Sequence, residues 1–157
     1  EELKADRKNI WAGFEDQGPN QNQVFEFEKY EFNGLRLDRI LQTINTRIEV
    51  LLDRDHTIGH SYFFKVKEAT NKEKALKKVF KDNIIPLLQE YFYGDYSRIG
   101  LVLGEGFVRQ AGKAEEKIFA KFGDTTDSVE VSERYELISI DEKFNISEAL
   151  KLLAINA

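Results

Sequence analysis

The feature that most constrains the fold is a run of apolar residues at helical spacing within residues 35–53. Apolar side chains recur every three or four positions, and polar or charged side chains fill the positions between them. This pattern predicts an amphipathic helix over residues 35–53 with one face in a core. Asn33 and Gly34 are expected to end a preceding strand and to cap this helix. The apolar positions are Leu37, Ile40, Leu41, Ile44, Ile48, Leu51 and Leu52.

Two further helical segments follow. Residues 61–66 form a short aromatic stretch that favours a helix or turn. Thr70 stands three positions before Glu73, and this capping-box spacing predicts a helix that begins after Thr70. Pro86 has no amide donor and restricts the residue before it, so we expect the helix to break or kink within residues 82–85.

Capping residues also mark the helices nearer the C-terminus. Gly94 is expected to be a C-cap, and Asp95 is expected to cap a short helix over residues 96–103. Asn145 stands three positions before Glu148, which predicts a last helix after Asn145.

Short strands are expected on either side of the helices. Residues 24–32 alternate apolar and charged side chains, the pattern of a half-buried strand. Residues 129–131 and 135–140 are expected to form a hairpin that turns at residues 132–134, and residues 114–119 are expected to be helical. The fold class is therefore mainly α, a helical bundle with short β-strands near both ends.

Composition excludes several classes of function. The 157 residues suit a single folded domain, and a net charge of -5 argues against general attraction to nucleic acid or acidic membranes. Because there is no cysteine, disulfides, thiolate metal sites and cysteine nucleophiles are excluded. No signal peptide or membrane-spanning run is recognised, so we expect a cytoplasmic protein. The chain lacks methionine and opens on Glu1, so we expect a piece of a longer protein.

Two motifs carry a family resemblance. Residues 58–63 read Ile-Gly-His-Ser-Tyr-Phe, and residues 85–92 read Ile-Pro-Leu-Leu-Gln-Glu-Tyr-Phe. In this order, about one helix apart, they resemble the lid of McrB-type proteins, the AAA+ GTPase subunits of restriction systems that cut DNA containing modified cytosine. The resemblance spans roughly residues 35–104.

The resemblance implies a division of the chain. Residues 34–104 would be a helical AAA+ lid-type bundle. Residues 1–33 would be an N-terminal extension with a linker and a strand, and residues 105–157 a C-terminal extension with a small β-hairpin and a helix.

The resemblance also implies a function. In the parent protein the lid would close over GTP or ATP with Mg²⁺, GTP being favoured, and would contribute to ring assembly. Its partners would be the AAA+ core of its own chain, neighbouring subunits and a McrC-type nuclease subunit, with DNA contacted only through the parent complex and no membrane. We expect no catalytic residue and no activity in this chain alone, because it has no Gly-x-x-x-x-Gly-Lys-Ser/Thr phosphate loop. Gly100, Gly104 and Gly106 instead indicate a helix end and a turn.

Three residues are candidates for contact with nucleotide. In AAA+ lids a glycine followed by a basic residue at the start of a lid helix reaches the terminal phosphates, and Gly59-His60 holds a comparable place. We therefore expect His60 to face phosphate, with Arg54 as the other candidate. The usual residue is arginine, whereas histidine, with a pKa of about 6.5, is only partly charged at neutral pH. Alternatively, His60, Ser61 and Tyr62 hold the helix junction by hydrogen bonds.

Other patterns are expected to be structural. His56 and His60 lie four residues apart near Asp53 and Asp55, but Gly59 interrupts the helix that would align them, so we expect no metal site. Lysines between residues 65 and 81 alternate with aromatics, a pattern also found in single-strand nucleic-acid sites. Helical spacing favours core aromatics and a solvated lysine face instead. A helical protein–protein interaction or adaptor module without NTPase activity is the alternative from a different class.

Overall fold

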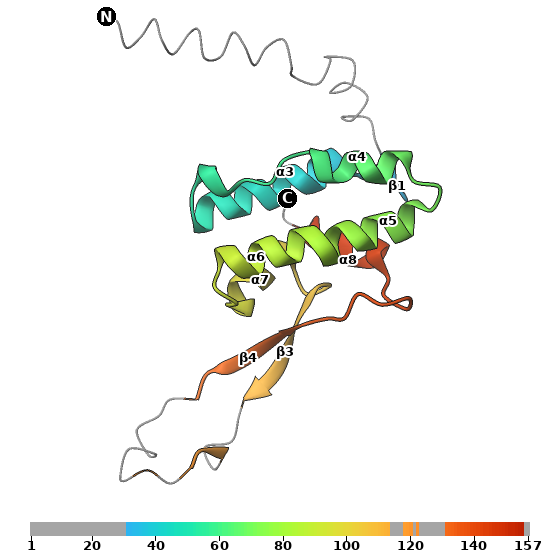
Figure 1. The fold of residues 1–157 in the computed structure, drawn as a ribbon. Helices are drawn as coiled ribbons and strands as arrows, with labels where there is room; N and C mark the ends of the chain where they lie inside the picture. Colours follow the sequence, from blue (N-terminus) through green and yellow to red (C-terminus); the bar gives the residue numbers. More distant parts are fainter. Residues whose placement is uncertain (1–30, 114–117, 121, 123–130, 156–157) are drawn as a thin grey trace, which may run out of the picture.

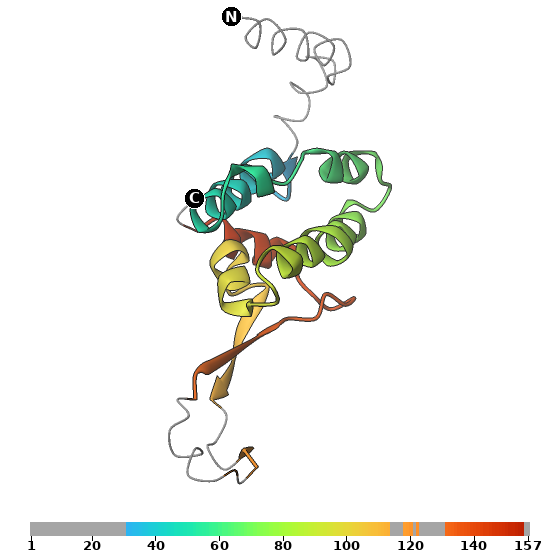
Figure 2. The same cartoon turned by 60° about the vertical axis from the view of Figure 1, so that its left-hand side comes forward.

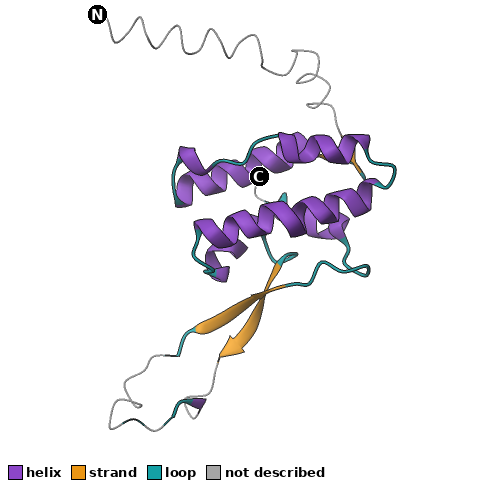
Figure 3. Cartoon of the chain, viewed as in Figure 1, coloured by secondary structure: helices purple, strands orange, loops and turns teal. Residues whose placement is uncertain are grey.

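The computed structural model describes residues 31–113, 118–120, 122 and 131–155. In this part of the chain, helices form the body and short antiparallel strand pairs lie near both ends, which confirms the predicted fold class (Figures 1 and 3). The predicted strand and loop before residue 31, and much of the segment expected to be helical near residue 116, lie outside the described residues.

The long predicted helix is present as α3, Leu37–Leu51. It begins two residues later than predicted, because Leu35–Arg36 (β2) pairs with Glu31–Phe32 (β1). Between these strands Asn33 and Gly34 have φ values of 49° and 78°. Two successive positive φ angles are typical of a tight β-hairpin turn, a role for which Asn-Gly is favoured. The expectation that this pair caps the helix is therefore wrong.

The aromatic segment forms α4, Ser61–Glu68, and the lysine-rich segment forms α5, Lys72–Val79. The cap of α5 is Asn71, whose side chain accepts a hydrogen bond from the Lys74 amide at 2.9 Å. The predicted cap at Thr70 is thus wrong by one residue. Asparagine is the stronger N-cap residue, and Asn71 has the extended backbone that a cap requires.

The helix was predicted to break or kink within residues 82–85; its α-geometry is interrupted there, but the helix does not end. The chain remains helical through a π-turn, η2 (Phe80–Ile84), and continues as α6, Ile85–Tyr91. The Ile85 amide donates to the carbonyl of Phe80, five residues back. In an α-helix the proline ring would collide with the carbonyl four residues before it. We attribute the wider turn to Pro86, because a π-turn moves that carbonyl away from the ring.

The end of α6 is closed by a Schellman arrangement. The Gly94 amide donates to the Gln89 carbonyl at 2.8 Å, and the Tyr93 amide donates to the Glu90 carbonyl at 3.3 Å. The predicted C-cap region is therefore confirmed, although the chain first turns left-handed at Tyr93, before Gly94.

Helix α7, Tyr96–Leu103, begins at the predicted cap, Asp95. Asp95 accepts hydrogen bonds from the amides of Ser97 and Arg98. The helix ends at Gly104, whose φ of 85° favours glycine. Gly104 and Gly106 mark the helix end and the turn after it as predicted, whereas Gly100 lies inside α7.

A β-ribbon follows α7 and projects from the helical body in both views (Figures 1 and 2). It pairs β3, Val108–Lys113, with β4, Glu133–Leu137, and Gly112 (φ 79°) stands beside an irregularity in the pairing. The predicted hairpin turn at residues 132–134 is wrong, because Glu133 and Arg134 lie inside β4 and their partner strand is β3.

The last helix, α8 (Ile146–Leu153), begins at the predicted cap: Asn145 accepts from the Glu148 amide at 3.1 Å. Its apolar face joins the same core as the helices before it. The division of the chain near residue 104 stays a prediction, but α8 packs against α5 as part of one body.

A row of aromatic rings runs through the core. Phe63 of α4 lies 6.2 Å from Phe80, Phe80 stacks on Phe107 at 4.9 Å, and Phe107 lies 5.6 Å from Phe144, measured between ring centroids. We call these four residues the aromatic row. It links α4, the π-turn, the segment after α7 and the loop before α8. In the part of the chain that the structure describes, no helix has the length and apolar character needed to cross a membrane.

Candidate functional site

The candidate phosphate-facing residues lie in the loop that joins α3 to α4, which contains the 3-10 turn η1, Arg54–His56. Asp53 begins this turn: one carboxylate oxygen accepts from the amides of Asp55 (2.9 Å) and His56 (3.2 Å) and lies 2.6 Å from Nδ1 of His56. The hydrogen bond with His56 is the main cause that lowers the pKa of Asp53, and the turn amides lower it further.

A side chain of α3 fixes the other half of the loop. Asn45 donates from Nδ2 to the carbonyl of Ile58 at 2.9 Å, and its Oδ1 accepts from the Ile58 amide at 2.7 Å. The Ile58 side chain is buried. Sequence reasoning did not identify Asn45, because nothing in the polar face of a helix distinguishes an amide with a distant backbone partner from one in solvent. We call Asn45 with the Ile58 backbone the Asn45 clamp.

Gly59 and His60 follow the clamp and lead into α4. His60 is the N-cap of α4, is exposed, and makes no side-chain cap hydrogen bond. A Cβ added at Gly59 would meet only the Ser61 hydroxyl, at 4.0 Å, and Gly59 does not have a positive φ. Packing within the chain therefore does not require glycine here. A glycine leaves the backbone open to close approach by a ligand.

Arg54 lies in η1 with an exposed side chain. Its Nε is 2.5 Å from a carboxylate oxygen of Glu49 on α3. The pKa of Arg54 is raised, first by this hydrogen bond and then by the charge of Glu49. An exposed ion pair of this kind contributes little to stability, so the guanidinium can exchange Glu49 for another anion at small cost.

His56 connects the loop to α6. Its ring lies edge-on to the ring of Tyr91, with centroids 4.9 Å apart. The same imidazole bonds to Asp53. Within the described residues no group of three or more His, Asp or Glu side chains could hold a metal ion. Asp53, His56 and the Asn45 clamp hold this junction. The alternative, that His60, Ser61 and Tyr62 hold it by hydrogen bonds, stays a prediction.

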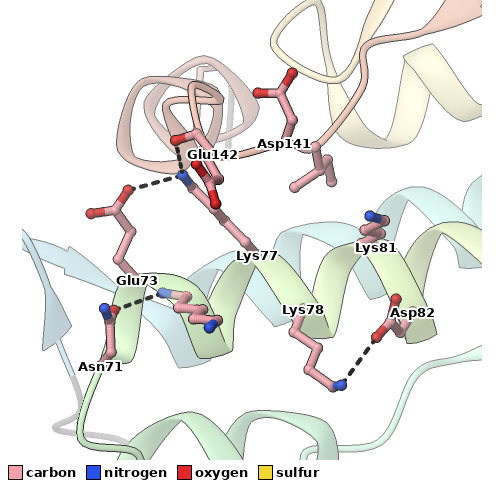
Figure 4. Close-up of a pocket in the computed structure, with 10 residues that line it drawn as sticks. Asn71, Glu73, Lys77, Lys78, Lys81, Asp82, Asp141 and Glu142 are labelled. Carbon is pink, nitrogen blue, oxygen red and sulfur yellow. Dashed lines mark hydrogen bonds and ion pairs between the residues drawn. The ribbon is translucent and has the colours of Figure 1, made fainter.

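A concave region of about 530 Å³ lies between α5 and residues 140–142, away from this loop (Figure 4). Lys77 is 3.2 Å from Glu73 and donates to the carbonyl of Glu142 at 3.1 Å, and Lys78 is 3.6 Å from Asp82. Carboxylates therefore neutralise two of these lysines, which argues against a site for the phosphate backbone of a nucleic acid. The lining residues are Asn71, Glu73, Lys74, Lys77, Lys78, Lys81, Asp82, Ile140, Asp141 and Glu142.

Comparison with known families identifies the segment that carries the loop. Residues 36–100 match the family model described as McrB, alpha-helical lid domain. The match runs from the start of α3 into α7 and contains Arg54, Gly59 and His60. The predicted resemblance is confirmed over this segment. No curated protein matches the chain.

Proposed function

Because residues 36–100 match the family model of the McrB alpha-helical lid domain, we propose that this chain carries the lid of a McrB-like AAA+ nucleoside triphosphatase in a modification-dependent DNA restriction system. The lid closes over a nucleoside triphosphate held by the AAA+ core, with Mg²⁺, and GTP is the favoured nucleotide. It contributes to ring assembly with neighbouring subunits, and the ring acts with a McrC-type nuclease subunit.

The observation that carries this proposal is the fixed loop between α3 and α4. The Asn45 clamp and the Asp53 cap hold the backbone on both sides of Thr57, so Arg54 and His60 project from a rigid support. Both side chains are basic, and His60 stands at the start of α4, where the helix dipole favours an anion. The anion that we propose for this loop is the terminal phosphate group of the nucleotide over which the lid closes.

The chain supplies one side of such a site. It has no phosphate loop whose backbone amides could bind the phosphates from the opposite side. We therefore expect the 157-residue chain to bind neither GTP nor ATP when it is titrated calorimetrically with magnesium present, while circular dichroism shows it to be folded. Micromolar binding would mean that the chain holds a complete phosphate site and would contradict a lid that acts only with its core.

A second experiment tests the phosphate contact in the full-length protein that carries this chain. We expect R54A and H60A each to weaken GTP binding about ten-fold, since a hydrogen bond to a charged group contributes about 1.5–3 kcal/mol. R134A removes an exposed arginine from β4 and serves as the matched control. Wild-type affinity in both R54A and H60A would overturn the assignment of this loop to phosphate.

A further inference from the structure

Tyr93 has an unusual backbone and an unusually exposed ring. Its φ is 52°, and among the described residues the only other non-glycine with positive φ is Asn33, in a hairpin turn. The left-handed region is unfavourable for a bulky side chain and common for asparagine or glycine. The tyrosine side chain is 97% exposed. Neither the turn nor the core explains why a tyrosine occupies this position, and such outliers gather at functional sites.

The two residues before Tyr93 are fixed. Phe92 is buried in the core, and the Tyr91 ring lies against His56 of η1. The Tyr93 amide donates to Glu90, so the backbone is held in its left-handed turn. The ring is thus presented to solvent from a rigid support. An aromatic side chain loses little conformational entropy when it binds from such a position.

The same turn lies beside the candidate phosphate loop. The His56–Tyr91 contact joins the two, and Tyr93 follows Tyr91 by two residues, a span of at most about 7 Å. The last turns of α3 and α6 lie at the same end of the helical body (Figure 1). This end therefore carries the Arg54 side chain, which suits phosphate, and, close to it, the exposed ring of Tyr93. His60 lies farther along the same loop, just after Ile58, whose backbone is held by Asn45 in the middle of α3.

We propose that Tyr93 stacks on the purine base of the nucleotide whose terminal phosphates face Arg54 and His60. This inference rests on the proposed function. Stacking on an aromatic ring is available to any base, because every base has a π-face. Tyr93 accordingly raises the affinity for GTP and ATP alike and does not select between them.

The test compares nucleotides with an anion that has no base. In the full-length protein, Y93A and Y93G weaken GTP and ATP binding about ten-fold in calorimetric titrations, as expected for the loss of one base–aromatic contact. Binding of magnesium tripolyphosphate is unchanged. Y93F keeps the ring and retains wild-type affinity. Y93G also removes the backbone strain, so weaker binding by this variant reports the missing ring and not a damaged turn.

Y135A removes another exposed tyrosine, on β4, and is the matched control. Unchanged GTP affinity in Y93A and Y93G overturns the stacking role, and if ring assembly is lost instead, Tyr93 belongs to a protein contact. Failure of the wild-type protein to bind any nucleotide overturns the proposed function itself. Loss of tripolyphosphate binding in R54A, together with wild-type GTP binding in Y93A, would support the phosphate contact of Arg54 and contradict the stacking role of Tyr93.

Discussion

At Gly106 the backbone lies too close to α8 for any side chain. A Cβ built there would lie 2.6 Å from Cα and 3.0 Å from Cβ of Ala149. We expect G106A to lower the free energy of unfolding by about 1–3 kcal/mol, because the added methyl group would clash with Ala149 and displace α8. Urea unfolding of the 157-residue chain measures this change. G59A adds the same methyl group where the nearest atom is 4.0 Å away, and it should leave stability nearly unchanged.

The Asn45 clamp gives a second prediction for a single residue. N45A removes both hydrogen bonds to Ile58 and leaves its half-buried backbone groups without this partner. We expect a loss of about 1–3 kcal/mol in unfolding free energy. Amide exchange should also become faster at Ile58 and its neighbours. T46A, on the exposed side of the same helix, is the control; an equal loss in T46A would contradict a specific role for the clamp.

Sequence reasoning found the candidate residues of the site but not what holds them. Arg54, Gly59 and His60 came from motif likeness. The Asn45 clamp joins residues 13 positions apart through the backbone of a loop, and loop conformation leaves no periodic signal in a sequence. Helical spacing favours a core position for most aromatics, but the left-handed turn places Tyr93 in solvent. Helical spacing could not reveal this, because α6 ends at Tyr91, two residues before Tyr93.

At the scale of elements, the start of α7 depends on one carboxylate. Asp95 accepts from the hydroxyl and amide of Ser97, at 2.6 and 3.0 Å, and from the amide of Arg98 at 3.3 Å. The hydrogen bond with the Ser97 side chain is the main cause that lowers the pKa of Asp95. A carboxyl group whose pKa is lower in the folded state than in the unfolded state stabilises the fold at pH values above its unfolded-state pKa. This stabilisation is lost as the pH falls through the folded-state pKa.

We therefore expect the stability difference between wild type and D95N to shrink as pH is lowered below about 4, the ordinary pKa of an aspartate. Asparagine caps a helix about as well as aspartate but does not titrate in this range, so D95N is the matched reference. D95A should cost about 1 kcal/mol at neutral pH. Thermal unfolding at neutral and acidic pH measures both effects; a difference between wild type and D95N that does not depend on pH would refute the assignment.

Elements with strong periodicity or a clear cap were predicted, and elements shaped by a distant partner were not. The apolar spacing of α3 and the caps of α7 and α8 are local signals, and each was confirmed. Strand β3 has the sequence Val-Arg-Gln-Ala-Gly-Lys, with little apolar alternation, and it exists because β4 pairs with it. Pro86 correctly indicated an interruption of the α-helix, but it could not indicate that the helix continues through a π-turn, because proline disfavours α-geometry without excluding a wider helix.

At the scale of the whole molecule, Arg47 joins three helices. From α3 it donates to the carbonyl of Val102, at the end of α7, at 2.8 Å, and to that of Ile155, just after α8, at 3.0 Å. Burial lowers its pKa, and the carbonyls at helix C-termini are favourable partners for a cation.

We expect R47A to lower the unfolding free energy by about 1.5 kcal/mol and to speed amide exchange in α8 more than in α3. R39A removes an exposed arginine from the same helix and is the control. R47K should recover only part of the loss, since a lysine lacks the planar fork that reaches two carbonyls. Equal exchange rates for α8 in R47A and wild type would contradict this role.

The core extends beyond the segment matched as a lid domain. Residues 36–100 carry the family match, yet Phe107, Phe144 and the apolar face of α8 belong to the same core. The family motifs could not indicate this extension, because they end before it. We expect from this shared core that the matched segment requires the residues after it in order to fold stably.

The aromatic row also has a mechanical consequence. Its four rings are packed in series from α4 to the start of α8, and a close-packed interior transmits displacement instead of absorbing it. A displacement of α4 would therefore be passed from ring to ring to Phe107, next to β3, and would move the β-ribbon together with α4.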